Sequence, residues 1–102
     1  MINKADMLEA NAIEIAAWTE AFGQIADPDS SAAAAIHKHI DALVNRERIM
    51  ELPEDEIAKI RLEAVDREIE QSADATWRAI EADLPREKVS EIKRYIDDLR
   101  HR

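Results

Sequence analysis

The feature that most constrains this sequence is a long stretch between Pro53 and Pro85 that contains neither proline nor glycine. Nothing in this stretch obliges a helix to end, because proline and glycine are the residues that most disfavour helix interiors. Residues suited to an inner helix face recur along it at helical spacing, namely Leu62, Val65, Ile69, Ala73, Thr76, Ile80 and Leu84. The pattern predicts one helix over about residues 53–83, roughly 45 Å long at 1.5 Å per residue. Gln71, Ser72 and Asp74 are its weak point, where a bend or restart is possible.

The rest of the chain offers little material for β-structure. It has one glycine and three prolines, and no segment alternates cleanly between apolar and polar residues. Hydrophobic residues make up 46% and charged residues 36%, a balance typical of a folded chain. We therefore predict a single all-α domain over residues 1–102, a four-helix bundle-like fold. The expected helices cover about residues 3–26, 28–50, 53–83 and 85–101.

Three short motifs predict where these helices begin. Asp27-Pro28-Asp29-Ser30 places a capping side chain at Asp27 before a proline suited to the first helical position. Leu52-Pro53 and Leu84-Pro85 each precede an apolar residue, Ile57 and Val89, at the spacing of a hydrophobic staple. The connections between helices should therefore be short, and successive helices should be antiparallel neighbours or sharp corners.

Two of the predicted helices carry a second apolar strip, which only a helix contacted from two sides requires. Small residues form the second strip of the first helix, and a partner helix could approach them closely. Trp18 and Trp77 have core spacing, although one of them could anchor an interface. The excess apolar surface predicts self-association, most simply as a two-fold homodimer. The expected interface residues are Ala10, Ile13, Ala17, Ala21, Ile57, Ile60, Ala64 and Trp77.

Asn11 lies within the main apolar stripe of the first helix. An asparagine there can fix the register of an assembly by meeting its own copy. It can equally lie at the edge of the helix, and the sequence leaves both readings open.

Two pairs of side chains are weak candidates for a metal site. His37 and Asp41 are four residues apart on one helix, and Glu63 and Asp66 are three apart on the next. A magnesium or manganese site would need a second acidic helix converging on Glu63 and Asp66. Arg61 and Arg67 are instead expected to pair with nearby carboxylates on a solvated face. We predict no cofactor, and neither pair is assigned as a metal site.

Other catalytic chemistries lack their residues. The chain has no cysteine, no glycine-rich phosphate loop and no nucleophile elbow around its serines. A histidine phosphotransfer bundle would use His37, but Asp41 one turn away would repel a phosphoryl group. Catalysis is therefore not the favoured reading.

The charge balance limits the partners. The net charge is −9, and the acids dominate residues 1–83 while the bases outnumber them over 84–102. An acidic surface repels phosphate backbones, so no direct contact with nucleic acid is expected. The longest apolar run, Ala32 to Ile36, is too short to span a bilayer, and Asp6, Glu9 and Glu14 interrupt any signal-peptide core. A cytoplasmic location is the expectation.

The sequence favours a non-enzymatic protein–protein interaction module, such as a small acidic regulator, adaptor or inhibitor that acts through exposed apolar helix faces. A basic protein surface would suit its charge. A metal-dependent all-α hydrolase using Glu63 and Asp66 is the alternative, followed by the phosphotransfer bundle. The sequence specifies neither the partner nor the process.

Overall fold

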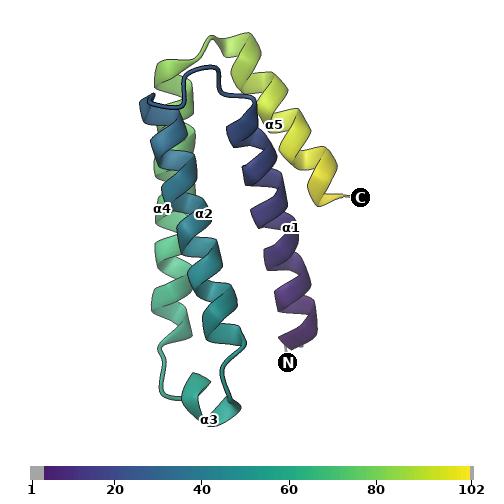
Figure 1. Cartoon of the computed structure of the whole chain (residues 1–102), viewed down its shortest axis with the longest axis vertical. Coiled ribbons are helices and arrows are strands. Elements are labelled where there is room, and N and C mark those ends of the chain that lie inside the picture. Colours follow the sequence, from purple (N-terminus) through teal and green to yellow (C-terminus); the bar gives the residue numbers. More distant parts are fainter. Residues whose placement is uncertain (1–3, 102) are drawn as a thin grey trace.

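A computed structural model describes residues 4–101, which are all-helical and contain five helices. They are α1 (Lys4–Gly23), α2 (Ser31–Met50), α3 (Glu54–Ile57), α4 (Leu62–Asp83) and α5 (Arg86–Arg100). The long helices α1, α2 and α4 run alternately up and down, and the single turn of α3 closes the end between α2 and α4 (Figure 1). Helix α2 is central, because it packs against both α1 and α4. Helix α5 turns back and lies mainly against α1.

Leu43 and Met50 of α2 extend the core toward the end that carries α3, but most of the core lies where α5 covers the other helices. Trp18 of α1, Ile36 of α2 and Ile80 of α4 are fully buried there, together with Ile92 and Ile96 of α5. Burying side chains of this size stabilises the fold by about 1.5–3 kcal/mol each. The α5 helix is therefore the fourth wall of this half of the bundle. It diverges from α4 and ends part-way down α1 (Figure 1).

The start of α2 differs from the sequence-based expectation. The predicted cap was Asp27, but the helix begins at Ser31, and the Ser30 hydroxyl accepts the backbone N–H of Ala33 at 3.2 Å. The Asp27 carboxylate instead accepts the N–H of Asp29 at 2.9 Å, which holds Pro28 in a turn ahead of the helix. A second cap comes from α4, where the Asp83 carboxylate accepts the N–H of Ala32 at 2.9 Å.

The helix expected over residues 53–83 is divided, so this part of the prediction is wrong. Helix α3 ends at Ile57, residues 58–61 form a connection, and α4 begins at Leu62. The suspected weak point at Gln71, Ser72 and Asp74 lies inside an unbroken α4. There the Ser72 hydroxyl donates to the Ile69 carbonyl at 2.9 Å, one turn back along the helix.

The pairing of α2 with α4 explains the break. Arg46 contacts Asp66 and His39 contacts Ser72, which sets one antiparallel register between the two helices. In this register the end of α2 lies opposite the start of α4, so residues 53–61 lie beyond α2. A straight continuation there would bury nothing, and most helical stability comes from packing an apolar face.

The molecule is elongated, with extents of 46 × 26 × 18 Å. Its Cα radius of gyration is 14.6 Å, whereas a compact chain of this length has about 12.8 Å. It exposes 7027 Å², against about 5,800 Å² for a compact monomer of 11.6 kDa. Across residues 4–101, no helix combines the length and apolar character that a bilayer crossing requires.

Candidate functional site

Helix α5 packs on the small-residue strip of α1. Ala17 and Ala21, two of the expected interface residues, are 0% exposed in the single chain, so another copy cannot reach them. The close approach that these alanines allow is therefore used within the chain. Ala10 is exposed and Ile13 is half-buried. Both line a hollow of about 290 Å³ near Arg100 at the end of α5.

Hydrogen bonds to acidic side chains of α1 hold α5 on this strip. Arg100 donates to both carboxylate oxygens of Glu14 at 2.8 Å, and this hydrogen bonding raises the pKa of the guanidinium. The Tyr95 hydroxyl donates to the Glu20 carboxylate at 2.5 Å. The basic character of residues 84–102 thus serves in part to dock α5 on acidic α1.

Trp77 is half-buried in the same contact. Its ring lies edge-on to Trp18, with 5.2 Å between centroids, and the Lys93 ammonium stands 5.5 Å from its centroid. The structure therefore joins Trp77 to the core through Trp18, and α5 limits its access from outside.

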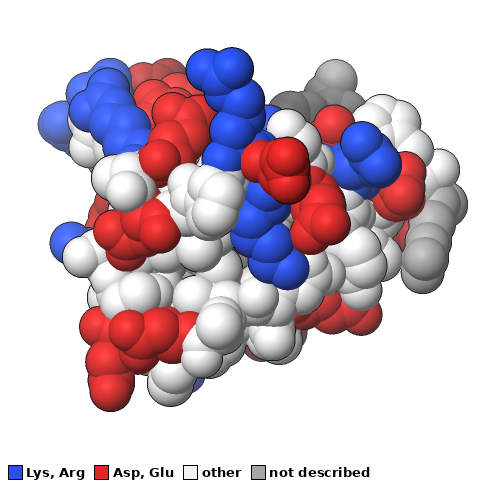
Figure 2. Space-filling model, turned by 90° about the horizontal axis from the view of Figure 1, so that it is seen from above, with Lys and Arg blue, Asp and Glu red and all other residues white. Residues whose placement is uncertain are grey.

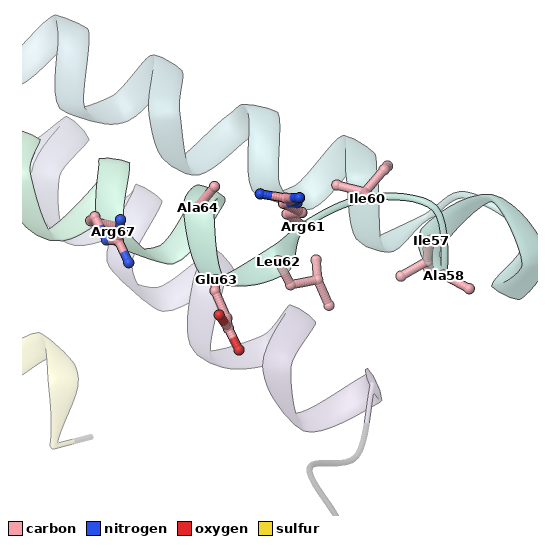
Figure 3. Close-up of a pocket in the computed structure, with 8 residues that line it drawn as sticks. All are labelled: Ile57, Ala58, Ile60, Arg61, Leu62, Glu63, Ala64 and Arg67. Atoms are coloured by element: carbon pink, nitrogen blue, oxygen red, sulfur yellow. The ribbon is translucent and has the colours of Figure 1, made fainter.

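The second strip of the divided helix faces a hollow. We call residues 52–67 the α3–α4 corner. Its hollow has a volume of about 570 Å³, and its apolar lining includes Ile57, Ile60 and Ala64 (Figure 3). Ile57 and Ile60 are half-buried and Ala64 is exposed. Leu52, at 37%, is the only large hydrophobic residue classed as exposed among the described residues. The structure thus brings three expected interface residues together beside an exposed leucine.

Two arginines at this corner do not form the expected pairs. Arg61 and Arg67 line the hollow with Glu63, but neither forms an ion pair within residues 4–101. Asp66, one of the carboxylates expected nearby, pairs with Arg46 at 3.2 Å. The corner therefore combines apolar side chains with two cations that have no acidic partner in the described chain.

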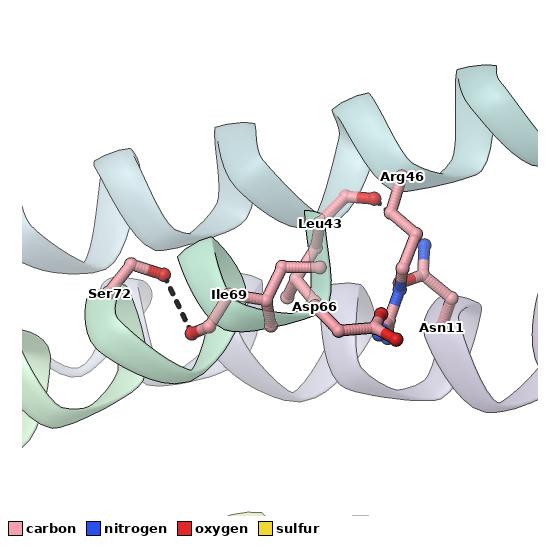
Figure 4. A network of polar contacts seen from close by, with 6 residues as sticks. All are labelled: Asn11, Leu43, Arg46, Asp66, Ile69 and Ser72. Carbon is pink, nitrogen blue, oxygen red and sulfur yellow. Dashed lines mark hydrogen bonds and ion pairs between the residues drawn. The ribbon is translucent and has the colours of Figure 1, made fainter. Parts of the chain in front are cut away.

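Asn11 is used inside the chain. It is 2% exposed, and its amide donates to the Leu43 carbonyl at 2.9 Å. Its carbonyl oxygen accepts from Arg46 Nε at 2.9 Å, and Arg46 reaches on to Asp66 of α4 (Figure 4). The sequence left open whether Asn11 meets its own copy or lies at the edge of the helix. The structure shows neither, because Asn11 links α1 to α2 and, through Arg46, to α4 of the same copy.

His39 is a buried residue that the sequence analysis missed. It is 2% exposed, its ring meets Trp18 edge-on at 5.1 Å, and its Nδ1 lies 2.6 Å from the Ser72 hydroxyl. The Ser72 hydroxyl also lies 2.9 Å from the Ile69 carbonyl, and the tautomer of His39 sets which group donates in the His39–Ser72 contact. Burial lowers the pKa of His39. His39 lies three residues after Ile36 and four before Leu43, and this helical spacing was the sequence signal that could have placed it on the apolar face.

The residues of the two weak metal candidates are not gathered into one site. His37 and Asp41 are 3.5 Å from each other, but both side chains are 69% exposed. Glu63 lines the hollow, whereas Asp66 turns to Arg46. Within the part of the chain that the structure describes, no three His, Asp or Glu side chains are grouped to share a metal ion.

The end of the molecule away from α3 carries mixed charge. Figure 2 views this end and shows Lys and Arg side chains interspersed with Asp and Glu, with uncharged surface between them. No field of one sign covers this face. The α3–α4 corner is therefore the more distinctive surface.

No family model, curated protein or solved structure matches the chain. What it does is therefore inferred from its own residues.

Proposed function

We propose that the chain is a non-enzymatic protein–protein interaction module, a small acidic regulator, adaptor or inhibitor. The observation that carries the proposal is the α3–α4 corner, where Ile57 and Ile60 line a hollow of about 570 Å³ and Leu52 is exposed. Apolar pockets with a few charged groups at the rim are typical anchors of protein interfaces.

The amount of exposed surface supports this proposal. The chain exposes about 1,200 Å² more than a compact monomer of its mass. One partner in a standard interface buries roughly 800 Å². The elongated bundle thus has surface to spare for a partner, and little of its interior depends on the α3–α4 corner.

The charge indicates the kind of heterologous partner. With a net charge of −9, the molecule would be attracted to a basic protein surface, and this attraction would speed their encounter. The apolar corner would supply the contact that persists after docking. We expect such a partner in the cytoplasm.

Capture of partners from native extract by three forms of the chain tests the proposal. Ile60→Glu places a charge in the hollow, and Gln71→Glu adds the same charge on an exposed part of α4. We expect a protein that the native chain and Gln71→Glu retain and that Ile60→Glu loses. Thermal unfolding of each form checks that it is folded.

Two outcomes would contradict the interaction module. One is the same set of captured proteins with all three forms. The other is a rise in the unfolding midpoint on titration with Mg²⁺ or Mn²⁺, since a real metal site stabilises the folded state by linkage. That result would favour the hydrolase reading instead.

A further inference from the structure

We propose that two copies of this chain associate through their α3–α4 corners. In this dimer, Leu52 of each copy enters the hollow of the other, and the carboxylates of each α3 meet Arg61 and Arg67 of the other. The inference rests on the proposed function, because it names one occupant of the same surface.

The apolar parts of the corner are complementary. Leu52 precedes α3 and is 37% exposed, whereas Ile57, Ile60 and Leu62 line the hollow (Figure 3). Leu52 is not among the residues that line the hollow, so it does not fill the hollow of its own chain. A leucine side chain is small enough for a space of about 570 Å³.

The charged parts are complementary as well. Glu54 and Asp55 form no ion pair with any described residue, whereas Glu56 is 3.8 Å from Lys59 of its own chain. Arg61 and Arg67 likewise lack an acidic partner within residues 4–101. One corner therefore presents three unpaired acids, Glu63 being the third, and two unpaired bases. Glu54 and Asp55 are the acids that a second corner in a two-fold arrangement would bring to Arg61 and Arg67.

A two-fold axis satisfies both kinds of contact at once. In an isologous interface the same patch faces itself, so each knob-and-hollow contact and each charge pair forms twice. Both halves of the pattern lie at the same end of the elongated molecule, as this arrangement requires (Figure 1). A protein partner that lacks this combination of apolar and charged groups would match only the apolar contact or only the charge pairs.

The size of the corner sets the strength of the dimer. Standard interfaces use roughly 20–30 residues a side, more than the corner spans, so the dimer is expected to dissociate on dilution. The charge pairs then decide whether it forms, since two copies of an acidic chain otherwise repel each other.

Charge exchange tests the arrangement in solution. One variant carries Arg61→Glu with Arg67→Glu, and the other carries Glu54→Arg with Asp55→Arg. All four residues are exposed, and circular dichroism checks that each variant keeps its helicity. By analytical ultracentrifugation over a concentration series, we expect the native chain to dimerise and each variant alone to dissociate at least tenfold more readily. An equimolar mixture of the two variants should dimerise again.

The control variant carries Arg78→Glu with Arg86→Glu, the same change in charge at exposed positions toward the opposite end. It should be dimeric like the native chain, apart from the general effect of added negative charge. A native chain that is monomeric throughout, a dimer that the corner variants do not weaken, or a mixture that does not recover association would each overturn the proposal. Loss of a heterologous partner by Ile60→Glu is measured separately, so the proposed function can stand if this dimer does not.

Discussion

Three buried polar side chains join the helices of this bundle. Asn11 connects α1 to the Leu43 carbonyl of α2, His39 of α2 contacts Ser72 of α4, and the Thr76 hydroxyl lies 3.1 Å from the Ala35 carbonyl. Buried polar groups are costly unless they are hydrogen-bonded, so each contact favours one alignment of its helices. These residues specify the register that their apolar neighbours would leave less defined.

The Asn11 contact predicts a clear loss of stability in Asn11→Ala. The substitution removes the acceptor of the Arg46 Nε–H, which is held between α1 and α4, so we expect a cost of roughly 1–3 kcal/mol in the free energy of unfolding. Urea denaturation measures it. Asn45→Ala, at an exposed position of the same helix as Arg46, should stay within about 0.5 kcal/mol of the native chain. Equal effects of the two substitutions would mean that Asn11 does not make this contact.

His39 predicts a dependence of stability on pH. Burial lowers its pKa in the folded chain, while the unfolded chain keeps a value near 6.5. The unfolded state therefore binds more protons once the pH falls below about 6.5, and stability falls with it. Comparing urea denaturation at about pH 7.5 and pH 5.5 should show this loss in the native chain.

The two histidine substitutions separate this effect from that of the carboxylates. His39→Gln should reduce the loss between the two pH values more than the control His37→Gln, which changes an exposed histidine of the same helix. An undiminished loss in His39→Gln would show that other groups cause it.

At the scale of elements, local signals predicted helices better than their ends. The all-α class, the start after Leu84-Pro85 and the end of α2 at Met50 all follow from periodicity and turn residues. The cap of α2 was misplaced because Asp27 and Ser30 are both good capping residues, and Pro28 fits either a turn or a first helical position. The choice depends on Asp83, which is far away in the sequence but caps the same end.

The α3–α4 break could not be predicted locally. No residue between Pro53 and Pro85 breaks a helix, so only the register of α2 against α4 shows that residues 53–61 have nothing to pack on. The same limit applied to the candidate interface. Ala17 and Ala21 were expected at an interface with another copy, but they are 0% exposed in the single chain, and the sequence did not show that the fold itself would cover them.

Adjacent serines test the observed start of α2. Ser30→Ala removes the hydroxyl that caps Ala33, so we expect a cost of about 1 kcal/mol and a midpoint lower by roughly 4–8 °C. Ser31→Ala changes the next residue, which is exposed and lies inside the helix, and should have little effect. Thermal denaturation followed by circular dichroism makes the comparison. The reverse order of the two effects would place the cap elsewhere.

The whole molecule has an uneven core. Every fully buried residue of α5 lies in the half that contains Trp18, while α3 has no buried residue. Stability should follow this distribution, because local opening is easiest where few apolar contacts must break.

Hydrogen exchange should therefore show a gradient along the long axis. Amides of α4 around Thr76 and Ile80 should exchange slowly, and those of α3 and the first turns of α4 should exchange fast. The measurement is made on the Arg61→Glu, Arg67→Glu variant, so that any association at the corner does not add protection. Uniform protection along α4 would contradict an uneven core.

The packing of α5 on α1 has a consequence during synthesis. Helices α1, α2 and α4 leave the ribosome before α5, and the Ala17 and Ala21 surface of α1 has no cover until α5 has emerged. Since α5 contacts α4 little and is tied to α1 by contacts such as Glu14–Arg100, the α5 of a neighbouring nascent chain could occupy the same groove. The short Leu84-Pro85 link, which keeps α5 close to its own α1, is then what favours closure within one chain over exchange of helices between chains.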